Sequence, residues 1–277
     1  MNENIRISPA PFLRWAGSKK ALIDYIKAYI PDQYNNYHEP FLGSGSVFFS
    51  LNKKDKTCYL SDVNKKLINT FIQIKYNIDS VCDKLRSYKN NSEYYYMVRN
   101  TESTDEVEEA ARFIYINKVC YNGLYRVNRG GKFNVPYGKR KNVDIVSEPL
   151  LRSVSTYLEN VIIENYDFEE SLKYIKKGDL VFIDPPYVVS HYENGFVEYN
   201  QQIFSWSDQV RLHDYILEVQ NKSAYFIMTN AAHSSISTLY ADIGNPSIIK
   251  RLSKIGGKSS FRGMVNEYLF TNTIKTV

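Results

Sequence analysis

The sequence predicts an α/β fold in which a sheet is interrupted by a helical insertion that carries a β-hairpin. Apolar runs of strand length alternate with helical patterns near both ends of the 277-residue chain. Between them, residues 64–119 place apolar side chains at three- and four-residue spacing, which is typical of helices. Glycines follow the first strand, as in doubly wound sheets that bind ligands at their strand ends.

Composition excludes several classes of protein. Hydrophobic residues make up 43% of the chain, enough for a sizeable core, but they never form the run of about 18 that a membrane helix needs. The N-terminal segment lacks the apolar centre of a signal peptide. The three cysteines and four histidines are scattered and show no metal-ligand spacing. We therefore expect a cytoplasmic protein with reduced thiols and no metal.

The first strand and turn predict a nucleoside site. A short strand ends near residue 40, Gly43 and Gly45 form a turn, and a helix is expected from about Ser46. The next strand ends in Asp62, which lies 19 residues after Gly43. In doubly wound folds an acid at about this spacing binds the ribose hydroxyls of adenosine. The glycine turn alone is weak evidence, but its combination with the spaced acid favours a nucleoside ligand.

Residues 118–141 predict a basic hairpin. Two alternating runs flank Arg129–Gly131, whose glycines supply the positive φ angles of a tight turn. The segment holds seven basic residues and no acidic residue, and aromatic and asparagine side chains alternate with the charges. A charge run often marks only a solvated face, but cations for phosphates beside amides for base edges suit nucleic acid better. We expect this hairpin to enter a DNA groove.

After the insertion the α/β alternation resumes. Strands are expected at 160–168, 178–184, 224–231 and 266–272, with a helix at 207–222 that Ser207 or Asp208 caps. Four strands of the sheet then end in polar residues: Asp62, Asp167, Asp184 and Asn230. Because ligands bind beyond the carboxyl ends of strands in open α/β sheets, we expect these side chains to converge.

The tetrapeptide Asp184-Pro185-Pro186-Tyr187 predicts chemistry on an exocyclic amine. The lone pair of adenine N6 is delocalised into the ring, so N6 must become pyramidal before it attacks a methyl group. We expect Asp184 and the carbonyl of Pro185 to accept its two N–H groups, with the proline pair keeping both acceptors rigid. The Tyr187 ring can stack on a flipped base. An ordinary turn after a strand is the alternative, which the nucleoside site upstream disfavours.

With these motifs in place, the chain resembles the Dam-type DNA adenine-N6 methyltransferases of the α group, close to the enzymes that methylate GATC. The resemblance covers nearly the whole chain. Its motifs are FLRWAGSKKAL (12–22), EPFLGSGSVFF (39–49), LSDVNKKLI (60–68), AARFIYINKVCYNGLYRVNRGGKFNVPYG (110–138), DPPY (184–187) and KSSFRGMVNEYLFTN (258–272). It implies a seven-stranded Rossmann-like methyltransferase sheet. Residues 1–62 would form the cofactor-binding part, 63–157 the target recognition domain and 158–277 the DPPY part.

The resemblance also implies S-adenosylmethionine as methyl donor and assigns residues to each part of the site. The implied cofactor residues are Trp15, Lys19, Phe41, Gly43, Gly45, Asp62 (ribose), Asp167 and Phe168 (adenine ring) and Asp184. The implied DNA-binding residues are Arg14, Tyr121, Asn122, Leu124, Arg126, Pro136 and Lys139. The catalytic set is Asp184, Pro185, Pro186 and Tyr187. Arg14 and Ser18 stand where lysine and glycine are common, and Lys139 stands where arginine is frequent.

The expected reaction is direct displacement on double-stranded DNA, without metal or membrane, by a monomer in a bacterial or phage-infected cell. Three alternatives stay open: a cytosine-N4 methyltransferase, an RNA adenine methyltransferase, and a non-catalytic DNA-binding regulator with the same fold. The intact tetrapeptide and glycine turn disfavour the regulator, and Asn122 and Arg126 in the basic hairpin favour duplex DNA over RNA. A protein-glutamine methyltransferase would carry asparagine in place of Asp184.

Overall fold

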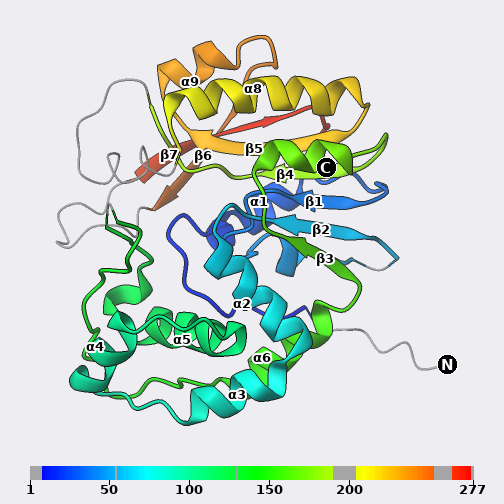
Figure 1. Cartoon of the computed structure of the whole chain (residues 1–277). Coiled ribbons are helices and arrows are strands. Elements are labelled where there is room, and N and C mark those ends of the chain that lie inside the picture. Colours follow the sequence, from blue (N-terminus) through cyan, green and yellow to red (C-terminus); the bar gives the residue numbers. More distant parts are fainter. Residues whose placement is uncertain (1–7, 54, 129, 190–203, 253–263, 276–277) are drawn as a thin grey trace. The chain divides into compact units, whose positions relative to one another are not determined.

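A computed structural model of the chain describes residues 8–53, 55–128, 130–189, 204–252 and 264–275 (Figure 1). The chain divides into two compact units. The first comprises Met1–Lys19, Leu42–Asp55 and Leu60–Asn165, and the second comprises Lys20–Phe41, Lys56–Tyr59 and Tyr166–Val277. Arg129 and residues 253–263, which include the start of the last sequence motif, lie outside the described residues. No helix among the described residues has both the length and the apolarity needed to cross a membrane.

Seven strands of the described chain form one sheet in the order β3-β2-β1-β4-β5-β7-β6. They are β1 (Tyr37–Glu39), β2 (Cys58–Ser61), β3 (Val161–Glu164), β4 (Leu180–Ile183), β5 (Tyr225–Ala231), β6 (Ser247–Leu252) and β7 (Met264–Thr271). Strand β4 pairs in parallel with β1 and β5, whereas β7 runs antiparallel to β5 and β6. The expected α/β sheet of seven strands is confirmed.

Five α-helices lie in the described part of the first unit. They are α2 (Lys65–Tyr76), α3 (Ile78–Arg86), α4 (Ser92–Asn100), α5 (Glu106–Val119) and α6 (Glu148–Tyr157). Three of them begin at a side chain that accepts a backbone N–H: Asn64 for α2, Asn91 for α4 and Asp105 for α5. Helix α5 is buried along most of its length and packs against α2, α3 and α4 (Figure 1). The helical periodicity of residues 64–119 is therefore confirmed.

The second unit contains η1 (Lys19–Leu22, whose first residue belongs to the first unit), α1 (Ile23–Lys27), α8 (Trp206–Asn221) and α9 (Ser234–Leu239). Helix α8 packs on β5 and buries Leu212 and Ile216 against Phe226 and Met228. The expected cap of α8 at Ser207 or Asp208 is wrong. Ser205 is the N-cap, because its hydroxyl accepts the Asp208 N–H while the Asp208 carboxylate accepts the Ser205 N–H.

Two other sequence expectations differ from the structure. The helix expected from Ser46 is only a short 3-10 turn, η2 (Phe48–Ser50). The Ser46 hydroxyl bonds those of Ser44 and Ser18, and such side-chain bonds compete with regular helix. Strand β6 was not anticipated. Its short sequence gives one clear alternation, with Ile249 buried between exposed Ile248 and Lys250.

Candidate active site

The glycine turn of the first unit is closed by Asp62. Gly43 (φ +48°) and Gly45 (φ +67°) both occupy the left-handed region that favours glycine. The Gly43 N–H donates to Asp62 Oδ2 at 3.0 Å, and the Asn64 N–H donates to Oδ1 at 2.9 Å. Burial raises the pKa of Asp62, although these two donors oppose the shift. The acid expected after this strand thus lies directly against the turn.

Trp15 and Lys19 also lie in the first unit. A Cβ at Gly43 would come 2.9 Å from Trp15 Cδ1, so the indole packs directly on the turn. The same indole stacks on Tyr125, within residues 118–141, at 4.9 Å between ring centroids. Lys19 is buried, and its ammonium donates to the Gly17 carbonyl at 2.8 Å. Trp15 therefore connects the glycine turn to the segment expected to bind DNA.

In the second unit, Asp167 and Phe168 begin the 3-10 helix η4 (Phe168–Lys173). Asp167 is its N-cap and accepts the Glu169 N–H at 3.2 Å. The strand expected to end in Asp167 ends instead at Glu164, because the cap conformation starts a helical turn. Phe168 is buried and stacks on Phe41, with ring centroids 5.3 Å apart. The structure thus brings Phe41 and Phe168 together beside an acidic cap.

The tetrapeptide follows the central strand β4, and two residues that the sequence analysis missed hold it in place. Thr229 of β5 donates its hydroxyl to Asp184 Oδ1 at 2.8 Å. Tyr187 donates its hydroxyl to Glu267 Oε2 of β7 at 2.8 Å. Burial, with the charges of Asp184 and Glu267, raises the pKa of Tyr187 well above its usual value, so this phenol stays neutral. The sequence signal that could have identified Thr229 and Glu267 is that each is a polar residue inside a largely apolar strand.

Asn230 does not join this group. It is fully buried within β5, and its amide donates to Gln209 Oε1 of α8 at 3.1 Å. Successive side chains of a strand point to opposite faces, so Asn230 and Thr229 project to different sides of the sheet. The expectation that Asn230 belongs with the strand-end acids is therefore wrong, and its role is to tie β5 to α8.

Residues 118–141, which are expected to bind DNA, are held by few backbone bonds. In the part of the expected hairpin that the structure describes, two isolated bridges form, Cys120↔Tyr137 and Val127↔Phe133, instead of extended strands. Its start is η3 (Tyr121–Gly123), in which Tyr121 is 49% exposed and Asn122 has a φ of +55°. The Tyr121 N–H donates to the carbonyl of exposed Pro136 at 2.8 Å, and half-buried Leu124 follows. These expected DNA-binding residues share one exposed region.

Arg126 is oriented by the opposite side of the same loop. Its Nε donates to Asn134 Oδ1 at 2.8 Å, and no described residue bonds its two terminal nitrogens. Asn128 Oδ1 accepts the N–H groups of Gly130 and Lys132, both at 3.0 Å, which closes the turn. The loop therefore presents an exposed arginine that Asn134 holds through its Nε.

Arg14 adds a cation to this region. The side chain of Arg14 lies across Gly123, where a Cβ would come 2.2 Å from Arg14 Cδ, so only glycine fits. Asn117 accepts the Arg14 N–H at 2.9 Å and donates to its carbonyl at 2.8 Å. Burial, together with the Arg14 charge, lowers the pKa of Lys118 to about 8. Lys139 is exposed at a φ of +54°. Arg14 and Lys118 are close enough to repel one another, which suits a polyanionic ligand.

A comparison with protein families now identifies the chain. Residues 15–254 match the family model described as D12 class N6 adenine-specific DNA methyltransferase. The chain belongs to this family. It is 37% identical over 277 residues, 96% of each chain, to the Type II methyltransferase M1.LlaDCHI of Lactococcus lactis subsp. cremoris. It is 36% identical over 242 residues to the Type II methyltransferase M.MjaIII of Methanocaldococcus jannaschii, covering 80% of this chain and 84% of that protein.

A DNA adenine methylase is also among the relatives of this methyltransferase. The Haemophilus influenzae enzyme of that name is 31% identical over 230 residues, covering 80% of this chain and 79% of that protein. The relatives thus carry both Type II methyltransferase and DNA adenine methylase names, and the chain is an adenine-specific DNA methyltransferase.

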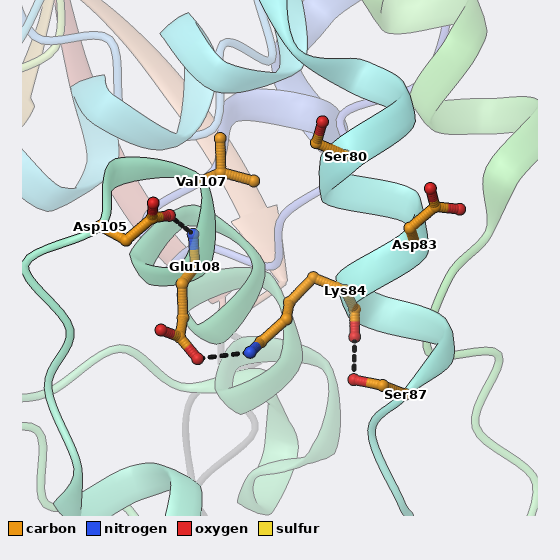
Figure 2. Close-up of a pocket in the computed structure, with 7 residues that line it drawn as sticks. All are labelled: Ser80, Asp83, Lys84, Ser87, Asp105, Val107 and Glu108. Carbon is orange, nitrogen blue, oxygen red and sulfur yellow. Dashed lines mark hydrogen bonds and ion pairs between the residues drawn. The ribbon is translucent and has the colours of Figure 1, made fainter.

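A hollow of about 600 Å³ in the first unit is lined by none of the expected site residues of this methyltransferase (Figure 2). It is lined by Ser80, Asp83, Lys84, Ser87, Asp105, Val107 and Glu108, from α3 and the start of α5. Lys84 pairs with Glu108, and Asp105 caps α5 by accepting the Glu108 N–H. These three polar side chains of the hollow therefore have structural roles. Within the described part of the chain, no group of three or more potential metal ligands occurs.

Proposed function

We propose that this methyltransferase transfers the methyl group of S-adenosylmethionine to adenine N6 in duplex DNA, in the sequence GATC, by base flipping and direct displacement. The observation that carries the proposal is the anchored tetrapeptide. Asp184 is oriented by Thr229 and Tyr187 by Glu267, so both groups are pre-positioned at the end of β4. Pre-positioned acceptors stabilise developing charge without reorganisation during the reaction.

The proposed mechanism assigns one task to each residue of the tetrapeptide. Asp184 and the Pro185 carbonyl each accept one N–H of N6, which directs the nitrogen lone pair out of the base plane. Pro186 keeps the turn rigid, and the Tyr187 ring stacks on the flipped base. The donor supplies an electrophilic methyl group on a sulfonium. As N6 forms its bond to the methyl carbon, the C–S bond breaks with its electron pair on sulfur, and N6 then loses a proton.

The described residues fit an adenosine-containing donor. Asp62 beside the Gly43 turn suits the ribose hydroxyls, as in other doubly wound folds. The stacked rings of Phe41 and Phe168 offer an apolar surface for a purine, and Asp167 offers a carboxylate for its amino group. Trp15, Lys19 and Gly45 complete the proposed donor set. The carboxylates carry the negative charge that a sulfonium and an adenine amine favour.

For DNA we propose residues 63–157 as the target recognition domain, between the catalytic parts 1–62 and 158–277. The proposed contacts are Arg14, Tyr121, Asn122, Leu124, Arg126, Pro136 and Lys139. Their exposure and the absence of acidic residues from 118–141 support binding to a polyanion. GATC specificity rests on their match to the Dam-type pattern. The enzyme would act as a monomer in the cytoplasm of a bacterial or phage-infected cell.

Methyl-group mapping tests this proposal. Plasmid DNA from a strain without other adenine methylation is recovered after expression of the enzyme and read by long-read sequencing. We expect N6-methyladenine at the adenine of GATC, and an inactive Asp184→Ala variant gives the background. N4-methylcytosine would support the cytosine-specific alternative. DNA binding without any methyl mark would support the regulator, and N6-methyladenine in another sequence would overturn only the GATC assignment.

A further inference from the structure

Arg211 of α8 bonds three carboxylates of the second unit. Its guanidinium nitrogens bond Asp167 Oδ1 at 2.7 Å, Glu169 Oε2 at 2.7 Å and Oε1 at 3.1 Å, and Asp208 Oδ1 at 2.8 Å. A planar guanidinium with several fixed partners defines their positions far better than a single ion pair does. Arg211 is therefore suited to set the geometry of the residues around it.

The backbone of Arg211 is itself fixed. Asp208 Oδ2 accepts the N–H and hydroxyl of Ser205, both at 2.7 Å, in the capping box of α8. The remaining oxygen of Asp208 holds Arg211, and the adjacent Leu212 is fully buried in the core under α8. The guanidinium thus extends from a capped and buried helical turn, which limits its movement.

The two oxygens of Asp167 have different surroundings. Oδ1 accepts both from Arg211 and from the Glu169 N–H. No described residue bonds Oδ2. A carboxylate with one oxygen held in this way presents its second oxygen at a defined point as an acceptor. Adenine carries an amino donor at C6, whereas hypoxanthine carries a carbonyl acceptor there, so such an oxygen distinguishes the two bases.

Arg211 also contacts the neighbouring ring. Its guanidinium carbon lies 4.9 Å from the ring centroid of Phe168, within cation–π distance. The same ring stacks on Phe41, with an interplanar angle of 26°. One arginine therefore fixes both the carboxylate and the aromatic ring that begin η4.

We propose that Arg211 is a positioning residue for the adenine ring of the methyl donor. By holding Oδ1 of Asp167 and contacting Phe168, it directs Oδ2 toward the 6-amino group and gives the site its preference for adenine. This proposal rests on the proposed function, which assigns Asp167 and Phe168 to the donor.

The test compares two ligands of the full-length enzyme by calorimetry. One is S-adenosylhomocysteine, and the other is S-inosylhomocysteine, which carries a carbonyl in place of the amino group. We expect the wild type to prefer the adenine ligand by about tenfold or more, since a mismatched acceptor pair loses a hydrogen bond. R211M should weaken adenine-ligand binding about tenfold and reduce the preference to about threefold or less. R211K keeps the charge but not the fork and should lie between.

Turnover separates positioning from general damage. At saturating donor, R211M should retain its kcat within about threefold while its KM for the donor rises with the loss of affinity. Arg152 of α6 provides a matched control, because it bonds Asp79 at 2.7 Å and Glu148 at 2.8 Å with similar exposure. R152M should leave both affinities unchanged. If R211M does not fold, the ligand preference of R211K decides: a preference below that of the wild type supports the proposal, and an unchanged preference overturns it.

The outcomes distinguish this proposal from the function on which it rests. An equal loss of both ligands in R211M, with an unchanged preference, would show that Arg211 only supports the fold and would overturn the proposal. Unchanged affinities in R211M would also overturn it. If the wild-type enzyme methylates adenine but binds both ligands equally, the adenine-selecting role of Asp167 and Arg211 is overturned, while the proposed function stands. Wild-type enzyme that binds neither ligand would overturn the proposed donor itself.

Discussion

Asp184 is oriented by a residue that lies 45 positions later in the chain. The pairing of β4 with β5 sets Ile183 opposite Met228, so Thr229 lies beside Asp184. Thr229 is fully buried, and its hydroxyl donates to one carboxylate oxygen. A buried donor of this kind restricts the rotation of the carboxylate before substrate arrives. The position of the proposed catalytic acid therefore depends on sheet register as much as on its own strand.

Thr229→Val tests this dependence, because valine keeps the branched shape and removes the hydroxyl. We expect methyl transfer in a single turnover to slow by about tenfold or more, while donor affinity changes little. Thr229→Ser, which keeps a hydroxyl, should retain most of the rate. A wild-type rate in the valine variant would mean that other contacts orient Asp184.

Local sequence reveals the strand-end acids but not the residues that hold them. Asp62 and Asp184 each follow directly on an apolar run, so a short window is enough to identify them. The partners Thr229, Glu267 and Arg211 lie 45, 80 and 44 residues from the groups they bond, and only strand register and helix docking bring them together. Asn230 was assigned wrongly for the same reason, because its bond to Gln209 depends on the docking of α8.

Residues 118–141 form the loop that we propose to bind DNA through its exposed side chains. Asn128 closes the turn of this loop, and Asn134 holds Arg126. Asparagine side-chain hydrogen bonds therefore stabilise the loop where an extended strand ladder does not form. Alternating residues and glycines indicated the turn correctly. They could not show that the described residues of the hairpin form two isolated bridges instead of a ladder, because ladder length depends on tertiary contacts.

Arg126 and Lys132 should separate base recognition from phosphate binding. Arg126→Ala should cost about 1–3 kcal/mol at one guanine and relax specificity at that position. Lys132→Ala should weaken all sequences alike and lower the salt slope of binding by about one unit. The measurement is methylation of GATC and its single-base variants at two salt concentrations. If Arg126→Ala slows every sequence equally, Arg126 contacts only phosphate.

The contact between α8 and the segment after α9 predicts a pH-dependent stability. His213 bonds Asp242 at 2.9 Å and Asp214 at 3.1 Å. Burial lowers the pKa of His213, but the two carboxylates outweigh it and raise the pKa above 6.5. Because the pKa of His213 is higher in the folded protein than in the unfolded chain, its protonation stabilises the fold at pH values below the unfolded-state pKa. This contribution disappears as the pH rises through the folded-state pKa.

His213→Gln should therefore lower the melting temperature more at pH 5.5 than at pH 8.5. Thermal unfolding of wild type and variant at both values provides the measurement. Asp242→Asn removes the closer partner and should reduce the same difference. A loss of melting temperature that is equal at the two pH values would show that His213 contributes packing rather than charge.

At the scale of the whole chain, positive charge is concentrated where DNA is proposed to bind. Residues 118–141 contribute seven positive charges, two more than the net +5 of the complete sequence. The remainder of the chain therefore carries a slight negative net charge, and residues 118–141 offer a strong attraction to DNA. Family membership, the basic segment and the anchored tetrapeptide agree on one activity, transfer of a methyl group to adenine in DNA.

Single-turnover methyl transfer tests that claim most directly. Purified enzyme is mixed with labelled S-adenosylmethionine and a duplex containing one GATC site, and the digested nucleosides are analysed by mass spectrometry. We predict N6-methyladenine as the product, with a rate that falls by roughly 10²–10³ or more in a folded Asp184→Ala variant. Methyl on cytosine N4, or transfer to adenine by Asp184→Ala at the wild-type rate, would contradict this activity.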